Sequence, residues 1–150
     1  MLCDPRRVPR GRSSAEPDGG ADPEALEKLK QANKRMVVLS NSSKRQDHSV
    51  QMLSKLGFDP NDFELIITSG EVSWNILSGN LKDEWLESHV QDNEKNLFVL
   101  GSGDGDVEYC ESCGWTVTPI EQASLILARG TFTINDGSGN VVHKNDDAEA

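Results

Sequence analysis

A short uninterrupted apolar run, residues 36–39 (MVVL), constrains the fold of this chain more than any other stretch. Its apolar side chains do not alternate with polar ones, so the run predicts a strand buried on both faces, as in a parallel sheet. The small polar residues SNSS follow at 40–43 and lead into a helical pattern. Ligands bind at the carboxyl edge of such sheets, and helix N-termini there favour anions. We therefore expect Ser40 and Asn41 to contact a phosphate group.

The same two residues have a simpler explanation. Serine and asparagine are common helix N-caps, and any strand–helix junction can carry them for that reason alone. Local chemistry therefore leaves two interpretations of Ser40 and Asn41 open, helix capping and anion binding.

The composition narrows the class of protein. A chain of 150 residues makes one domain at most. Its formal net charge of -10 argues against nucleic acid as a partner, because the phosphates would be repelled. No apolar run reaches membrane-spanning length, so we expect no membrane partner. Three cysteines without a secretory signal favour a reducing compartment. We expect a cytoplasmic protein, with organelle targeting by the arginine- and serine-containing start as the alternative.

Apolar runs alternate with helical patterns along the chain. The expected strands cover residues 36–39, 65–67, 97–100, 115–117 and 125–128. The expected helices cover about residues 23–32, 44–56, 71–77, 81–90 and 106–112, with a short helical turn at 120–123. Such alternation predicts βαβ units and a parallel sheet. The glycine-rich, polar residues from 129 onward carry no expected strand.

The order of the motifs resembles a known superfamily. The runs VVLSNSS, LGF and LIITSGE, with a helix between the first two, look like the haloacid dehalogenase (HAD) superfamily. They resemble most its class IIA members, such as the sugar-phosphate and nitrophenylphosphate phosphatases, whose cap domain follows the second motif. The similarity continues through LFVLGSGDGDVEYCESCGWTV to ASLILARG, like the first part of that cap, and covers roughly residues 24–130.

The resemblance implies an α/β fold class, with an incomplete Rossmann-like parallel sheet of the HAD type followed by part of an α/β C2 cap. The predicted division has four parts, which are a disordered segment at 1–21, a partial HAD-like core at 22–70, a partial C2-type cap at 71–135 and an acidic tail at 136–150.

The resemblance also implies a chemistry. The family hydrolyses small phosphate monoesters through an aspartyl-phosphate, with a second Asp as general acid/base and Mg²⁺ neutralising charge. The hydroxyl of the second motif, which orients the phosphate, maps onto Ser40, with Asn41 beside it. Thr68, Ser69 and Gly70 match the passage from core to cap, so they are expected to shape the hinge or the substrate entrance. The expected partner is a small phosphorylated metabolite.

The catalytic residues of the family have no identifiable positions here. No Asp-x-Asp follows an apolar strand upstream of Glu24, and Asp4 and Asp18 lie in polar surroundings. The family's later motifs belong after the cap, and the pair Asp146 and Asp147 follows no strand and is typical of a solvated tail. The sequence therefore predicts no catalytic residue and no ligand for Mg²⁺. The alternative to a hydrolase is a truncated, non-catalytic remnant that binds phosphate or another protein.

Two further motifs have simple explanations. Cys110 and Cys113 form a CxxC without the second pair that a structural zinc site needs, and we interpret them as incidental. The run GSGDGD at 101–106 follows a strand and opens a helix, as a phosphate-binding loop does. Its aspartates would repel phosphate, so a tight turn is favoured. Trp115 is expected in the core, and Trp74 either in the core or beside a substrate cleft.

The strand at 36–39 also predicts a behaviour in solution. One of its expected parallel neighbours would be the nucleophile-bearing strand, for which no sequence is found. An unpaired apolar edge recruits other strands, so we expect self-association through that edge.

Overall fold

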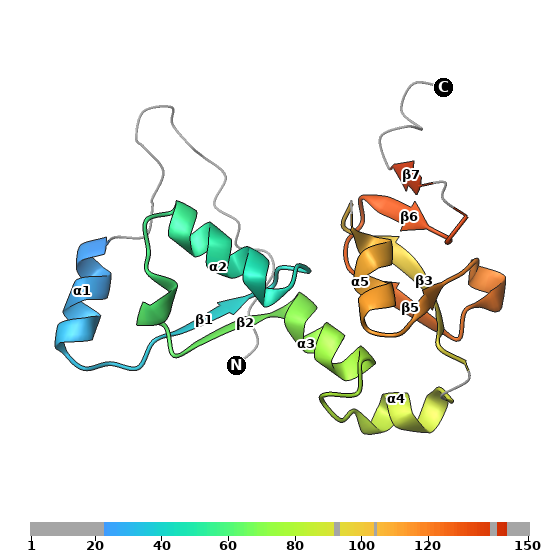
Figure 1. The fold of residues 1–150 in the computed structure, drawn as a ribbon, viewed down its shortest axis with the longest axis horizontal. Helices are drawn as coiled ribbons and strands as arrows, with labels where there is room; N and C mark the ends of the chain where they lie inside the picture. The colour runs from blue at the N-terminus through green and yellow to red at the C-terminus, as the bar shows by residue number, and fades with distance from the viewer. Residues whose placement is uncertain (1–22, 92–93, 104, 139–140, 144–150) are drawn as a thin grey trace, which may run out of the picture. The chain divides into compact units, whose positions relative to one another are not determined.

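A computed structural model describes residues 23–91, 94–103, 105–138 and 141–143 (Figure 1). The predicted disordered segment at 1–21, with Asp4 and Asp18, lies outside these residues, and so do Asp146 and Asp147. Internal contacts divide the chain into two units, Met1–Lys34 and Arg35–Ala150, and each is described by itself. In the part of the chain that the structure describes, no helix has the length and apolar character needed to span a membrane.

The first unit contributes one described helix, α1 (Pro23–Gln31), close to the predicted bounds. Proline at the first helical position suits a helix start, because its missing N–H would have no partner there. The chain leaves the helix through Asn33, which has a φ of 52°. This left-handed conformation is one that asparagine tolerates better than most residues.

The second unit begins with a βαβ arrangement. Strands β1 (Val37–Ser40) and β2 (Leu65–Thr68) pair in parallel, with Val37 opposite Leu65 and Ser40 opposite Thr68. Helix α2 (Gln46–Lys55) and the 3-10 turn η1 (Pro60–Asp62) connect them, and α2 packs against β2. The predicted parallel pairing is confirmed, and both strands end at hydroxyl-bearing residues on the same edge.

The expectation that the first strand is buried on both faces is wrong for this unit. Val37 is 53% exposed and Leu39 is 80% exposed, while Val38 and Ser40 on the other face are half-buried. Among the described residues β1 pairs with β2 alone, so it is an edge strand. A continuous apolar run is buried on both sides only where other elements cover both faces of the sheet.

A second sheet follows, centred on β3 (Asn96–Gly101). Helices α3 (Ser69–Leu77) and α4 (Glu84–His89) lead into it. Strand β5 (Leu125–Ala128) runs parallel to β3 along one edge. The other edge of β3 is shared, because β4 (Thr116–Val117) pairs in parallel with its first residues and β6 (Thr133–Asn135) pairs antiparallel with its last.

The remaining elements complete this sheet. Helix α5 (Asp106–Ser112) lies between β3 and β4, and the 3-10 turn η2 (Ile120–Gln122) precedes β5, both where the sequence predicts them. Strand β7 (Val141–His143) pairs antiparallel with β6. The sequence analysis expects no strand after residue 128, so β6 and β7 are corrections to it. The fold class is confirmed as α/β with parallel strands.

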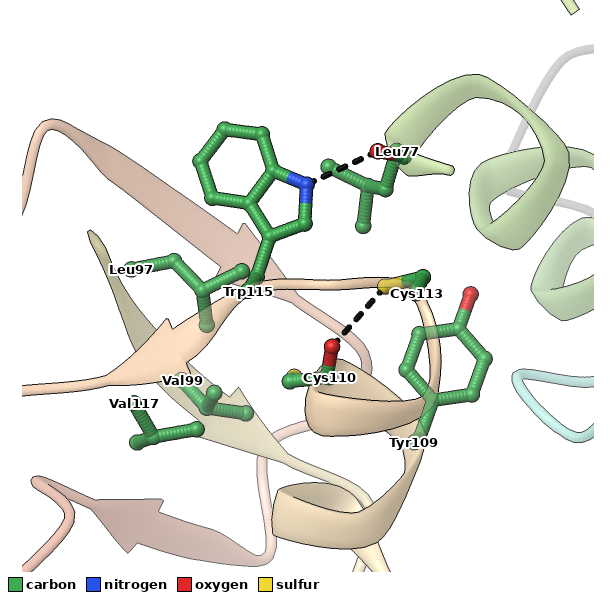
Figure 2. Packing of buried hydrophobic residues seen from close by; sticks show 8 residues of the cluster. All are labelled: Leu77, Leu97, Val99, Tyr109, Cys110, Cys113, Trp115 and Val117. Carbon is green, nitrogen blue, oxygen red and sulfur yellow. Dashed lines mark hydrogen bonds between the residues drawn. The ribbon is translucent and has the colours of Figure 1, made fainter. Parts of the chain in front are cut away.

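A hydrophobic core lies between α5 and the second sheet (Figure 2). Its buried members are Leu77, Leu97, Val99, Tyr109, Cys110, Cys113, Trp115 and Val117. The predicted place of Trp115 in the core is confirmed, and its indole Nε1 donates a hydrogen bond of 2.8 Å to the carbonyl of Leu77. This bond fastens the end of α3 to the sheet.

The two cysteines of the CxxC motif are part of this core. Both are free and buried, and the Cys113 thiol donates to the Cys110 carbonyl at 3.1 Å (Figure 2). Burial raises the pKa of Cys110 to about 12, which leaves almost no thiolate at neutral pH. A reactive or metal-binding cysteine needs the thiolate form, which burial disfavours, and both side chains pack in the core.

Candidate functional site

The loop after β1 is shaped by its own hydroxyl groups. The Ser40 hydroxyl oxygen accepts a hydrogen bond of 3.1 Å from the Ser42 amide, and the Ser42 hydroxyl oxygen accepts one of 3.2 Å from the Lys44 amide. These turns delay the start of α2 to Gln46, later than the sequence pattern predicts. A serine that accepts a hydrogen bond keeps its own O–H free to donate, so Ser40 retains a donor for a bound oxyanion.

Thr68, at the end of β2, is fully buried and acts as the N-cap of α3. Its hydroxyl accepts a hydrogen bond of 2.9 Å from the Glu71 amide and donates one of 2.8 Å to the Lys44 carbonyl. The hydroxyl is thus fully used within the protein. It ties the start of α3 to the loop that precedes α2.

Gly70 lets this loop approach the first turn of α3. Its amide donates a hydrogen bond of 2.9 Å to the Ser42 carbonyl. The carbonyl oxygen of Ser43 occupies the place that a β-carbon on residue 70 would need. A glycine is therefore required here by close packing of two backbones.

A second contact joins the same two segments. Arg45 donates to both carboxylate oxygens of Glu71, at 2.6 and 2.9 Å, and its guanidinium lies 3.7 Å from the centre of the Trp74 ring. The Gln46 amide also donates to Glu71, at 3.0 Å. The hydrogen bonds from Arg45 lower the pKa of Glu71 below its ordinary value of 4.5.

A cleft of about 260 Å³ opens between these segments and the second sheet. It is lined by residues of the loop after β1, of α3 and α5, and of the end of β5, namely Asn41, Ser43, Ser69, Gly70, Ser73, Tyr109, Leu127, Ala128 and Arg129. The side chains of Asn41, Ser43, Ser69 and Ser73 make no hydrogen bond within the described part of the chain. They leave neutral hydrogen-bonding groups available to a ligand.

Arg129, directly after β5, is the charged residue of the cleft. Its side chain is 5% exposed and forms an ion pair with Asp106, which is 1% exposed. Its Nη2 donates a hydrogen bond of 2.8 Å to the Ser43 carbonyl, and its guanidinium lies 3.7 Å from the centre of the Tyr109 ring. The Tyr109 hydroxyl in turn donates to the Gly70 carbonyl at 2.6 Å.

The GSGDGD loop binds a carboxylate of its own chain. The amides of Ser102 and Gly103 donate to one oxygen of Asp106, at 2.9 and 3.2 Å. Backbone amides that could bind a phosphate in such a loop are thus used by the Asp106 carboxylate. This arrangement favours the tight-turn interpretation of the motif.

The structure brings together part of the predicted site. Asn41, Ser69 and Gly70 line the cleft, whereas Ser40 shapes the adjoining loop and Thr68 is buried beneath it. The roles assigned to them stay predictions. Sequence patterns do not predict Arg129, Asp106 and Tyr109 as site residues, because these three meet from separate parts of the chain. The available signals were an aspartate in the last place of GSGDGD and an arginine directly after an apolar strand.

Comparison with models of known protein families identifies the family of this chain. A model of the haloacid dehalogenase-like hydrolase family matches residues 19–116, which is well over half of the chain. The protein therefore belongs to the haloacid dehalogenase-like hydrolases. Its α/β fold agrees with this family, and the described parallel strands make up part of a Rossmann-like fold. No curated protein and no solved structure matches the chain.

The magnesium ion typical of this family needs several carboxylates that converge on one point. Among the described residues, no group of three or more His, Cys, Asp or Glu side chains is arranged to hold a metal ion. Glu71 and Asp106, on the elements around the cleft, are each paired with an arginine. The described residues therefore do not fit a magnesium site.

Proposed function

We propose that the cleft binds the phosphate group of a small phosphorylated metabolite, with the Ser40 hydroxyl donating to a phosphate oxygen from the adjoining loop and Asn41 beside it. Such a ligand accepts hydrogen bonds at every oxygen, which suits a site rich in hydroxyl and amide donors. The free O–H of Ser40 supports its role, since its lone pairs already accept the Ser42 amide.

The observation that carries this proposal is the set of unused polar side chains on one cleft. Asn41, Ser43, Ser69 and Ser73 come from the segments after β1 and β2, at the carboxyl edge of a parallel pair, where α/β folds bind ligands. Helix capping does not account for these four side chains. The N-cap of α3 is Thr68, and the N-cap of α2 is Arg45, whose side chain makes no capping hydrogen bond.

Hydrolysis of a small phosphate monoester with Mg²⁺ is the second candidate, and membership of the hydrolase family favours it. It needs an aspartate nucleophile and free carboxylates for the metal. The pairing of Glu71 with Arg45 and of Asp106 with Arg129 makes both carboxylates poor candidates for that work. Binding without turnover is therefore the function that the described cleft supports best.

We further propose that the protein is of the class IIA type, with the second sheet as part of the C2 cap. The second sheet and its helices follow directly after β2, which is where the cap of class IIA members is inserted. The buried free thiols of Cys110 and Cys113 support a reducing compartment such as the cytoplasm.

Thermal unfolding of the full chain with increasing inorganic phosphate tests the binding proposal. A ligand that binds the folded state raises the melting temperature with concentration. We expect such a rise, and we expect Ser40→Ala to remove most of it. The control is Ser54→Ala, which removes an exposed hydroxyl on α2 outside the cleft. No rise at saturating phosphate in the unchanged chain would exclude the site.

Release of nitrophenol from para-nitrophenyl phosphate, with and without Mg²⁺, separates the two candidates. We expect no turnover from protein that circular dichroism shows to be folded. Turnover that depends on Mg²⁺ and is lost in Ser40→Ala would instead establish hydrolysis, with a nucleophile outside the described cleft.

A further inference from the structure

Arg129, which directly follows β5, occupies a buried position that a charged side chain would not take for stability alone. Its side chain is 5% exposed, and its Nε is buried with no hydrogen-bond partner among the described residues. Burying a guanidinium is costly, and an apolar residue of similar volume often serves as well in a core. The contacts of Arg129 therefore call for a role beyond filling space.

Arg129 reaches across the cleft to the loop that follows β1. Its Nη1 contacts Asp106, while its Nη2 donates to the Ser43 carbonyl at 2.8 Å. Asp106 is itself held by the amides of Ser102 and Gly103. The guanidinium is thus anchored on one side by a fixed carboxylate and holds a loop carbonyl on the other.

Tyr109 extends the same contact to the first turn of α3. Its ring lies under the guanidinium of Arg129 at 3.7 Å, and its hydroxyl donates to the Gly70 carbonyl at 2.6 Å. Burial raises the pKa of Tyr109 to about 12, so this donor keeps its proton at any physiological pH. Arg129 and Tyr109, both on the second sheet's side of the cleft, thus hold two backbone carbonyls on the opposite side, those of Ser43 and Gly70.

We infer that Arg129 is a positioning residue, which fixes the loop of Ser40–Ser43 against α3 so that the polar side chains converge on the cleft. The inference rests on the proposed phosphate site, because it assigns Arg129 to that site. It does not make the guanidinium a ligand of the phosphate. The planar fork of arginine bonds two acceptors at once, which the single ammonium of lysine does not do with the same geometry.

Hydrogen exchange at three amides of the full-length chain measures the order of the loop. The Ser42 amide bonds to the Ser40 hydroxyl, the Lys44 amide to the Ser42 hydroxyl and the Gly70 amide to the Ser42 carbonyl. We expect Arg129→Lys, which keeps the charge beside Asp106, to speed exchange at these amides at least tenfold while the melting temperature changes little.

A double variant, Arg129→Met with Asp106→Asn, removes both charges without leaving one unpaired. Asparagine keeps an acceptor for the amides of Ser102 and Gly103. We expect the same faster exchange as in Arg129→Lys, together with inorganic phosphate binding at least fivefold weaker than in the unchanged chain. Should this double variant not fold, Arg129→Lys still decides the question.

The matched control is Arg35→Met with Glu64→Gln. This pair is also an arginine on a carboxylate, but it precedes β1 and β2 and does not line the cleft of Asn41 and Arg129. We expect this control to leave phosphate affinity within about twofold of the unchanged chain. This range corresponds to a change of at most about 0.4 kcal/mol in the free energy of binding. An equal loss in this control would show a general effect of charge removal and overturn the inference.

The two proposals fail in different ways. Unchanged exchange at all three amides in both Arg129 variants would overturn the positioning role, whether or not phosphate binds. Faster exchange with unchanged phosphate affinity would overturn it too, because the order of the loop would then not matter for binding. If the unchanged chain binds no phosphate, the proposed function fails, and the exchange rates alone still establish whether Arg129 orders the loop.

Discussion

The carbonyl oxygen of Ser43 lies where a β-carbon on Gly70 would have to sit, so the loop after β1 and the first turn of α3 fit together only through a glycine. The amide of Gly70 adds a hydrogen bond of 2.9 Å to the Ser42 carbonyl beside it. This approach of two backbones brings Ser69 and Ser43 to one cleft.

Gly70→Ala is therefore expected to destabilise the protein by about 1–3 kcal/mol, the usual cost of forcing extra volume into a packed site. Urea unfolding followed by circular dichroism measures this change. The control is Ser73→Ala in the same helix, where a smaller side chain should cost far less. Equal stability of the two variants would mean that the loop moves away from α3 freely.

Trp115→Phe tests the link between α3 and the second sheet. The indole donates to the buried end of α3 at the Leu77 carbonyl, and phenylalanine leaves this carbonyl without a partner. We expect a loss of about 1–3 kcal/mol in the free energy of unfolding, the typical penalty for an unpaired buried polar group. Trp85→Phe on α4, where the indole is 58% exposed, should cost less than 1 kcal/mol by the usual size of surface effects. Similar losses in both variants would argue against the bond.

The sequence predicts correctly those elements that nearby residues determine, and it does not predict those that depend on pairing with distant residues. The bounds of α5 and β5 agree with the sequence pattern, because glycines stand on both sides of α5 and a continuous apolar run makes β5. Strands β6 and β7 have three residues each and form through antiparallel pairing that starts at the end of β3, which no local pattern reveals.

The candidate site shows the same limit. Asn41, Ser69 and Gly70 could be expected at one edge because they follow neighbouring parallel strands. Arg129 could not, since its contact with Asp106 joins residues 23 positions apart and its contact with Ser43 joins residues 86 apart. The apolar run also predicts a buried Leu39, but this residue is exposed, because the run does not tell whether a neighbouring element covers it.

High pH should destabilise the protein. Burial raises the pKa of Cys110 from 9.0 to about 12 and that of Tyr109 from 10.0 to about 12, so the folded state keeps protons that the unfolded chain releases. Stability is therefore full below pH 9 and falls as the pH rises from 9 to 12.

Each such group contributes a slope of at most about 1.4 kcal/mol per pH unit. Urea unfolding at a series of pH values should show a shallower decline for Cys110→Ala than for the unchanged chain. Identical slopes would mean that the Cys110 thiol ionises as readily in the folded state as in the unfolded one.

The exposed edge strand β1 predicts association of two copies of this chain. Val37 and Leu39 are 53% and 80% exposed, and β1 has β2 as its one partner strand among the described residues. Lysine on an edge strand opposes pairing with another strand. We expect sedimentation velocity to show concentration-dependent association of the unchanged chain and its loss in Leu39→Lys.

The control for this prediction is Leu56→Lys, which adds the same charge at a leucine that is 65% exposed after α2. It should leave the association unchanged. Monomeric behaviour of the unchanged chain at all concentrations would show that the edge is protected.

Titration calorimetry of inorganic phosphate into the full chain tests the central claim most directly. The account predicts heat of binding at a single site and an affinity about tenfold to a hundredfold lower in Ser40→Ala, because a hydrogen bond to a charged group contributes about 1.5–3 kcal/mol. Ser54→Ala should bind as the unchanged chain does. Absence of binding heat from folded protein, or equal affinity in Ser40→Ala, would contradict the claim that the edge beside β1 is a phosphate site.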